Sequence, residues 1–164
     1  MKSKNYLLIL LMIVSFSCSE EKKKESIDVS VITKEVKEVF DAYVNQVNSK
    51  GINGVDFYFS KDSRFYWIED GIKQYPNRES LLSAIEAFYP TVKTINLKAS
   101  KVDVEVLDLN TVMLYVEYVE DISLNSGYAF TLDGAMTILT IREDNTWKFL
   151  MGHSSIKKPR GENY

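Results

Sequence analysis

Apolar residues recur between positions 32 and 47 at the spacing of one helix face. An α-helix repeats every 3.6 residues, so apolar positions three and four apart form a single stripe that can face a core. Ser30 or Thr33 is expected to cap the start of this helix, and Gly51 to end it. The stripe consists of Ile32, Val36, Val39, Phe40, Tyr43, Val44 and Val47.

Two more helices are predicted after the first. NGVDFYFSKD, residues 53–62, has the composition of a short second helix or turn. A third helix is expected to begin after Asn77 and to end at Pro90, because proline cannot continue a helix. The apolar stripe of this third helix consists of Leu81, Leu82, Ile85, Phe88 and Tyr89.

The other segments have the alternation and the β-branched and aromatic content of strands. Residues 63–76 are predicted to form a β-hairpin, because aromatic-rich arms flank Asp70-Gly71, a favoured two-residue turn. The fold class is therefore α+β, with three N-terminal helices packed on one face of a curved antiparallel sheet. The sheet is expected to continue as a meander of strands over 92–107, 111–124, 128–142 and 146–156.

The first 17 residues have the features of an export signal. MKSKN is basic, and the apolar run that follows it, residues 6–16, is too short to span the ~30 Å core of a bilayer comfortably. Cys18, the only cysteine, follows directly, and VSFSC resembles the lipobox at which bacterial lipoproteins are cleaved and acylated. The alternative is a secreted protein whose leader happens to end near a cysteine.

These features predict four regions in the chain. A lipoprotein signal peptide covers 1–17, the lipidated Cys18 and a flexible tether cover 18–29, one folded domain covers 30–157, and a solvated tail covers 158–164. Acyl chains on Cys18 would bury methylene groups in a membrane and anchor the protein there. We expect a protein of the bacterial cell envelope, lipid-anchored to the outer membrane on its periplasmic or surface side.

Composition argues against several classes of function. The chain has 164 residues, is 45% hydrophobic and has a formal net charge of −3, and no cluster of Lys and Arg interrupts the predicted domain. Phosphate backbones need such clusters, so nucleic-acid binding is not expected. One histidine without an available cysteine cannot supply an ordinary zinc site. The sequence has no Gly-rich phosphate loop either, and no metal or cofactor is predicted.

The order of the predicted elements, together with three motifs, resembles the NTF2-like superfamily, closest to its SnoaL-like and DUF4440-type members. The resemblance covers residues 30–157 and implies a cone whose helices and curved sheet enclose a pocket. Members include isomerases, cyclases and dehydratases as well as non-catalytic binding domains, so the fold alone does not choose a function. The motifs are SKGINGVDFYFSKDSRFYWIEDG, NRESLLSAIEAFY and DNTWKFLMGHSS.

His153, the only histidine, is the first candidate for chemistry. Residues two apart on a strand share a face, so His153 and Met151 are expected to face the pocket together with Phe149. Asp133 stands beside Gly134, which suggests a bulge, and could turn inward to partner His153. In many DUF4440-like chains a second histidine stands at the position that Met151 occupies here. Met cannot transfer a proton, so a paired proton shuttle is absent. The candidate pocket wall is Tyr43, Phe65, Trp67, Met151 and His153.

Three functions remain open from the sequence. The leading hypothesis is a lipid-anchored envelope protein that binds a small apolar ligand or a protein partner without catalysis. The competing hypothesis is a small enzyme of the cyclase, isomerase or dehydratase type that uses His153, with Asp133 as its partner. A third is a scaffold that forms a homodimer through the other face of its sheet, as many members of the superfamily do.

Overall fold

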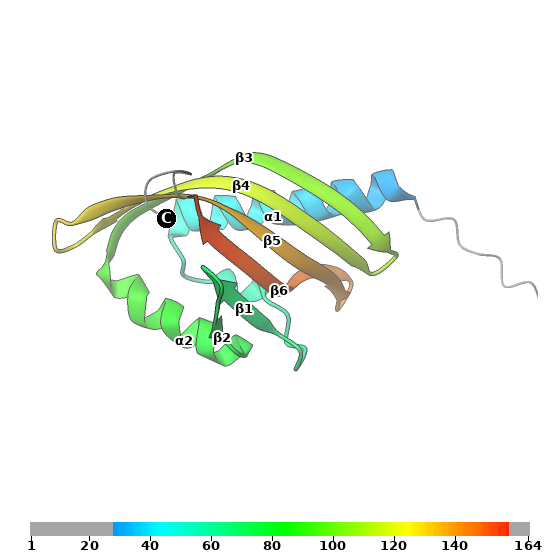
Figure 1. Cartoon of the computed structure of the whole chain (residues 1–164), viewed down its shortest axis with the longest axis horizontal. Coiled ribbons are helices and arrows are strands. Elements are labelled where there is room, and N and C mark those ends of the chain that lie inside the picture. Colours follow the sequence, from blue (N-terminus) through cyan, green and yellow to red (C-terminus); the bar gives the residue numbers. More distant parts are fainter. Residues whose placement is uncertain (1–27, 158–164) are drawn as a thin grey trace, which may run out of the picture.

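The computed structural model describes residues 28–157, which form a curved sheet with helices on its concave side (Figure 1). The predicted signal peptide, Cys18, nearly all of the tether and the tail lie outside the described residues. The elements are α1 (Val29–Lys50), η1 (Val55–Tyr58), β1 (Tyr66–Glu69), β2 (Ile72–Tyr75), α2 (Arg78–Phe88), η2 (Tyr89–Thr91), β3 (Val92–Asp108), β4 (Thr111–Leu124), β5 (Ala129–Glu143) and β6 (Thr146–Ile156).

Helix α1 follows the apolar stripe predicted from the sequence, and Ile32, Phe40 and Val47 on that stripe are buried. Its cap was predicted wrongly. Asp28 caps the helix, because its carboxylate accepts the backbone N–H groups of Ser30 and Val31. None of the helices within residues 28–157 has both the length and the apolar character needed to cross a membrane.

The predicted second helix is only a single turn of 3-10 helix, η1, so residues 28–157 contain two α-helices and not three. Gly54 is left-handed just before this turn, and Phe59 is already extended after it. The four residues between are too few for an α-helix. The extended backbone at Phe59 instead forms an isolated parallel bridge with Phe149 of β6.

The six strands of the described chain form a sheet in the order β2-β1-β6-β5-β4-β3. Strands β3 to β6 form the predicted antiparallel meander. The sheet is nevertheless mixed, because β1 pairs with β6 in parallel. The chain reaches β1 by running along β6 from the bridge at Phe59, and therefore enters the sheet in the same direction as β6.

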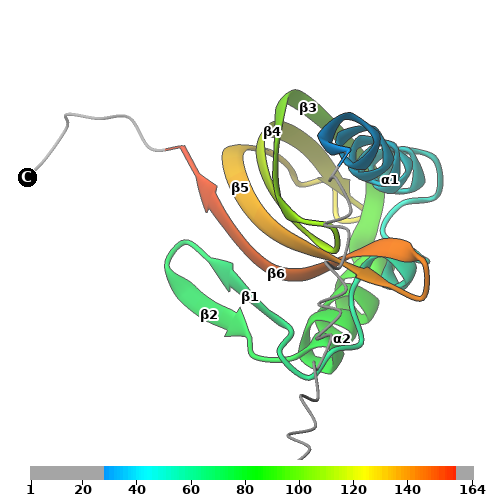
Figure 2. The same cartoon turned by 90° about the vertical axis from the view of Figure 1, so that its right-hand side faces the viewer.

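Two helices cover the concave side at different places. Helix α1 packs along β3, and α2 lies beside β2 at the other end of the curl (Figure 2). Both helices and the β1–β2 hairpin thus surround a space in front of the sheet. Its walls are apolar side chains of the core, among them Val55, Phe59, Leu97 and Phe149.

Candidate functional site

A cavity of about 230 Å³ lies between the concave face of the sheet, α1, α2 and the β1–β2 hairpin. We call it the cone cavity. Most of its wall is aromatic or aliphatic, and the charged side chains that reach it in the described chain are those of Glu69 and Glu120. It is lined by Tyr43, Ile52, Val55, Phe59, Trp67, Glu69, Tyr75, Leu81, Ile85, Leu97, Tyr118, Glu120, Leu132, Met136, Ile138, Phe149 and Ser154.

Tyr43 enters the cone cavity from α1 and is held by other rings. It meets Tyr58 and Phe149 edge to face, with ring centroids 5.4 Å apart in both pairs. Its hydroxyl forms no hydrogen bond with any other described residue. Burial raises the pKa of this hydroxyl, and the nearby Glu120 and Tyr118 raise it further. Tyr43 therefore presents a neutral, free hydroxyl to the cavity.

Glu120 is the functional candidate that sequence reasoning missed. Val116 and Tyr118 alternate along the inner face of β4, and Glu120 continues this series. Its carboxylate consequently reaches the cone cavity, where it has no hydrogen bond or ion pair with another described residue. Burial raises the pKa of Glu120 to about 7. The sequence did contain a signal for Glu120, because it is an acidic residue on the apolar face of a predicted strand.

Tyr118 lies beside Glu120 on the same face of β4, where Gly134 of β5 leaves space for it. A Cβ atom at Gly134 would stand only 2.9 Å from the Tyr118 hydroxyl. Burial, with Glu120 second, raises the pKa of this hydroxyl to about 12. Gly134 therefore allows the close packing of Tyr118. The strand pairing is regular at Gly134, so the bulge predicted there is absent.

The opposite wall is built by Trp67 on β1. Its indole N–H donates to the Ser154 hydroxyl over 3.2 Å, and its ring covers Gly152. A Cβ atom at Gly152 would lie 2.2 Å from that ring. Only a residue without a side chain lets Trp67 approach β6 closely enough to close the cavity.

The surface next to the cone cavity is acidic. A shallower depression of about 110 Å³ adjoins the cavity, shares Glu69 and Ser154 with it, and adds Asp70. Burial, followed by the charge of Asp70, raises the pKa of Glu69. Tyr75 stands next to Glu69, and burial raises the pKa of its hydroxyl as well.

A β-bulge interrupts the closing strand. Leu139 of β5 pairs with Met151 of β6. The next residue, Thr140, pairs with Phe149, so Leu150 is an extra residue in β6. One extra residue turns every later side chain of the strand to the opposite face.

This bulge corrects the predicted position of His153. Gly152 and Ser154 face the cone cavity, whereas Met151 and His153 point away from it, and His153 is exposed. Simple alternation from Trp147 placed both residues in the pocket wall. That prediction was wrong because the bulge shifts the pattern by one residue.

The other predicted site residues are divided between two places. Tyr43 and Trp67 line the cone cavity, but Phe65 lies behind its wall, edge-on to Phe59 with centroids 5.9 Å apart. Asp133 is exposed and forms an ion pair with Lys157 over 3.1 Å. It does not meet His153, which pairs with Thr137 four residues farther along β5. Within residues 28–157 no group of His, Cys, Asp and Glu is arranged to hold a metal ion.

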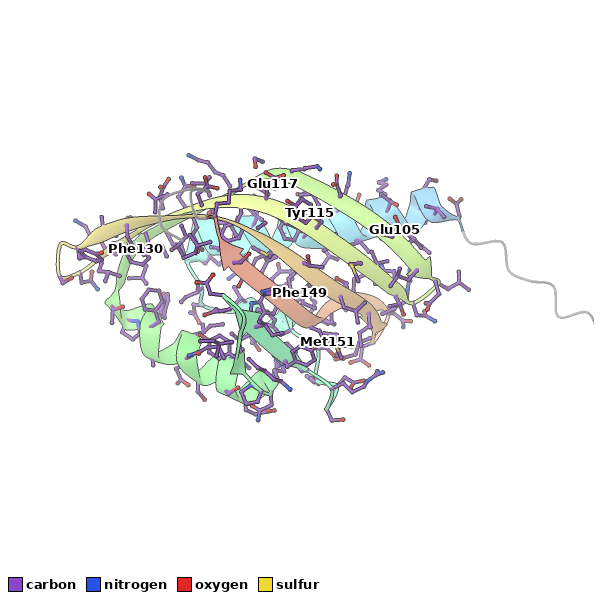
Figure 3. The ribbon with its side chains drawn as sticks, in the orientation of Figure 1. Glu105, Tyr115, Glu117, Phe130, Phe149 and Met151 are labelled. Carbon is purple, nitrogen blue, oxygen red and sulfur yellow. The ribbon has the colours of Figure 1, made fainter. Side chains whose placement is uncertain are left out.

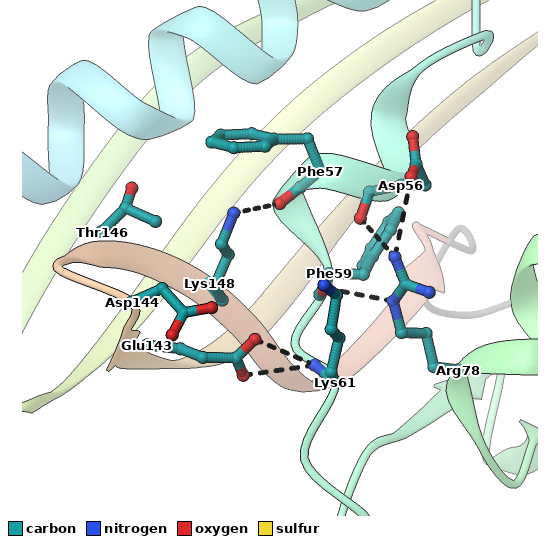
Figure 4. Close-up of a pocket in the computed structure, with 9 residues that line it drawn as sticks. All are labelled: Asp56, Phe57, Phe59, Lys61, Arg78, Glu143, Asp144, Thr146 and Lys148. Carbon is teal, nitrogen blue, oxygen red and sulfur yellow. Dashed lines mark hydrogen bonds and ion pairs between the residues drawn. The ribbon is translucent and has the colours of Figure 1, made fainter.

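A second hollow, of about 400 Å³, opens beside η1 at the edge of the molecule (Figure 4). Arg78 donates to the carbonyls of Phe59 and Asp56, over 3.2 and 2.8 Å. Lys148 donates to the Phe57 carbonyl and lies over the Phe57 ring. We call this hollow the edge cleft; it is lined by Asp56, Phe57, Phe59, Lys61, Arg78, Glu143, Asp144, Thr146 and Lys148.

Glu143 completes the interactions of the edge cleft. Its carboxylate accepts the Ser60 hydroxyl at 2.5 Å and the backbone N–H of Lys61 at 3.2 Å. These contacts from β5, with those of Arg78 from α2 and Lys148 from β6, fasten η1 and the residues just after it to the neighbouring elements (Figure 4). The edge cleft is therefore a structural joint, and the cone cavity is the better candidate site.

The convex face of the sheet carries both charged and apolar side chains (Figure 3). Met113 and Tyr115 are 39% and 37% exposed, and Glu117 stands beside them on β4. Met151 and His153 extend this face on β6. A mixed face of this kind suits a contact with another protein better than a ligand pocket.

Comparison with known families gives a clear match. The model of the SnoaL-like domain matches residues 36–159. This confirms the SnoaL-like part of the resemblance, whereas the likeness to DUF4440-type members stays a prediction. No curated protein matches the chain closely enough in sequence to count as a relative.

Solved structures share the fold at low sequence identity. A putative scytalone dehydratase from Novosphingobium aromaticivorans has a TM-score of 0.71 at 9% identity, over 79% of this chain and 86% of that one. An NTF2-like superfamily protein from Salmonella enterica has a TM-score of 0.66 at 16% identity, over 82% and 99%. A hexachlorocyclohexane dehydrochlorinase, LinA, has a TM-score of 0.64 at 13% identity, over 79% and 87%. At these identities the likeness shows the NTF2-like fold alone.

Proposed function

The chain belongs to the SnoaL-like domain family, and from this premise we propose that its cone cavity binds a small, mostly apolar molecule that carries a polar group. One observation carries the proposal. The cavity is apolar along most of its wall, yet Tyr43, Tyr118 and Glu120 bring polar groups together at one end. Pockets for small molecules combine an apolar wall with a few convergent polar groups in this way.

Unpaired polar groups in the cone cavity favour the binding of a ligand. A polar group that is partly withdrawn from water and has no partner loses part of its hydration without compensation. The hydroxyl of Tyr43 and the carboxylate of Glu120 both lack hydrogen-bond partners among the described residues. A ligand that hydrogen-bonds to them would offset this loss, whereas a purely apolar ligand would not.

Native mass spectrometry of the full-length protein tests this proposal, with Met136→Trp filling the cavity from β5. The wild type should carry a bound small molecule, and Met136→Trp should lose it. Met113→Trp is the matched control, because the same substitution on the convex face leaves the cavity unchanged. A ligand that stays bound in Met136→Trp, or a wild type that carries none, contradicts the proposal.

An enzyme is the second candidate for the same cavity. Glu120 supports it, because an acid with a pKa of about 7 can both take and return a proton near neutral pH. Two relatives by fold are named as a dehydratase and a dehydrochlorinase. The residue proposed for this chemistry is Glu120, and not His153 or Asp133, whose side chains lie outside the cavity.

We also propose that Cys18 is acylated and anchors the protein in the bacterial cell envelope, on the outer membrane. The export features of residues 1–17 support this proposal. Cys18→Ala should leave the membrane fraction and lose the mass of the acyl chains. A variant that stays in the membrane at the mass expected without acylation contradicts it.

The convex face is proposed as the contact of a homodimer. Its exposed Met113 and Tyr115 support this. Light scattering on Tyr115→Lys should give a monomer if the wild type is a dimer, whereas Lys93→Glu, a change outside this cluster, should not alter the mass. A wild-type monomer contradicts the proposal.

A further inference from the structure

The charge around the cone cavity has one sign. Glu69 and Glu120 contribute carboxylates, and none of the lining residues is Lys, Arg or His. Asp70 adds a third carboxylate in the adjoining depression. A ligand in the cavity therefore has carboxylates and no basic side chain around it.

Rings cover much of the same wall. Phe59 and Trp67 meet edge to face at 6.0 Å between centroids, and Tyr43 meets Phe149 in the same manner at 5.4 Å. The face of an aromatic ring carries partial negative charge and attracts cations. Six aromatic residues line the cavity: Tyr43, Phe59, Trp67, Tyr75, Tyr118 and Phe149.

Glu120 differs from the other carboxylates that the fold holds in place. Glu35 accepts both the Arg142 guanidinium and the Trp147 indole N–H, at 2.5 and 3.0 Å. Asp62 pairs with Arg64 at 2.7 Å. Glu120 has no such partner within residues 28–157, although its side chain reaches the cone cavity.

No element around Glu120 brings a countercharge. The titratable groups that share its cavity are Tyr43 from α1, Tyr118 from its own strand, Glu69 from β1 and Tyr75 from β2. The residues that α2, β3, β5 and β6 contribute to the wall are uncharged: Leu81, Ile85, Leu97, Leu132, Met136, Ile138, Phe149 and Ser154.

We propose that the ligand of the cone cavity is a small lipophilic cation, an amine or quaternary ammonium on an apolar body, whose charge lies against Glu120. This rests on the proposed function, because it names the ligand class of the same site. The ammonium group supplies the positive charge that no residue lining the cavity provides, and the aromatic rings of the wall contact the apolar body of the molecule. An anion meets only repulsion there, and a neutral molecule leaves the charge of the carboxylate uncompensated.

Equilibrium dialysis of the full-length protein tests this with three probes of similar shape. They are phenyltrimethylammonium, its neutral isostere tert-butylbenzene, and benzoate. We expect the cation to bind about tenfold more tightly than the neutral probe, a difference of the size that cation–π and charge contacts give. Benzoate should bind more weakly than both.

The affinity for the cation should also depend on pH. Glu120 must be ionised to pair with it, so binding should strengthen from about pH 6 to about pH 8. The neutral probe should bind with no such increase. A cation affinity that stays constant over this range overturns the assignment of Glu120 as the paired group.

Glu120→Gln separates charge from shape. It should lower the affinity for phenyltrimethylammonium about tenfold and remove the pH dependence, while tert-butylbenzene binds as before. Glu117→Gln, on the same strand but on the convex face, should change neither. Equal affinity of the wild type for the cation and the neutral probe overturns the inference but leaves the proposed function intact. If none of the probes binds, both are overturned.

Discussion

The cone cavity and the edge cleft differ in what their polar groups do. In the edge cleft, Arg78, Glu143 and Lys148 each contact the backbone of the segment around η1. In the cone cavity, Tyr43 and Glu120 form no side-chain hydrogen bond or ion pair with another described residue. These polar groups of the edge cleft are thus already paired within the protein, whereas Tyr43 and Glu120 in the cone cavity are free to bind a ligand. In this comparison the free polar groups, and not the volume, favour the cone cavity as the site.

The largest effect is expected where the cavity wall is tightest. Gly152→Val should lower the free energy of unfolding by about 3 kcal/mol, because its side chain would overlap the ring of Trp67. Trp67 must then leave the wall, and ligand binding should be lost as well. Denaturant unfolding and ligand binding measure the two effects.

A matched change at Gly71 controls for the loss of a glycine. A Cβ atom there meets nothing within 4 Å, although its φ of 85° favours glycine. Gly71→Val should therefore cost stability through backbone strain and leave ligand binding intact. If Gly152→Val still binds ligand normally, Trp67 does not close the cavity as described.

The edge cleft should respond in stability and not in binding. Lys148→Met removes the ammonium that donates to the Phe57 carbonyl and should cost about 2 kcal/mol. The cone cavity should bind its ligand as before. Lys61→Met is the control, because the Lys61 side chain forms no ion pair with any described residue. Loss of binding in Lys148→Met at unchanged stability would reverse the roles of the two hollows.

The cone cavity should show its unpaired charge as a dependence of stability on pH. The pKa of Glu120 is about 7 in the folded protein against an ordinary value of 4.5, so the folded state binds more protons between these values. The contribution of Glu120 to stability is therefore fully present below about pH 4.5 and is lost as pH rises to about 7. At pH 8, Glu120→Gln should be about 1–2 kcal/mol more stable than the wild type.

Chemical denaturation at several pH values measures this contribution. The difference between Glu120→Gln and the wild type should vanish at acid pH, where both side chains are neutral. Glu117→Gln should not share this pattern, because Glu117 pairs with Lys157 on the convex face. A difference that is independent of pH would show that Glu120 is not buried as an acid.

The smallest effect is expected at the residue that drew attention first in the sequence. His153→Ala should change the free energy of unfolding by less than about 0.5 kcal/mol, as is usual for exposed positions. It should leave ligand binding in the cone cavity unchanged. The same two assays measure it, and a loss of binding would place the functional site on the convex face.

Much of the fold was predictable because it follows from local patterns. The stripe of α1, the Asp70-Gly71 turn of the β1–β2 hairpin and the alternation in β4 each specify one element through neighbours a few residues away. The family motifs have the same local character. The second helix failed as a prediction because Phe59 is extended by a contact with Phe149, which lies far away in the sequence.

The candidate site was only half predictable. Tyr43 and Trp67 were named from the sequence, and the structure places both in the cone cavity. His153 and Met151 were misplaced, since no local pattern marks Leu150 as the extra residue of a bulge. Glu120 was overlooked although its position on the apolar face of β4 was visible in the sequence.

The sequence by itself therefore determined most of the helices and strands, because hydrophobic periodicity acts over short distances, and its motifs indicated a SnoaL-like domain. Only the tertiary structure decided which side of β6 faces the cavity and which carboxylate is left without a partner. Both depend on the pairing of strands that are distant in the chain. A bulge of one residue moved His153 outside, and the curl of the sheet enclosed Glu120.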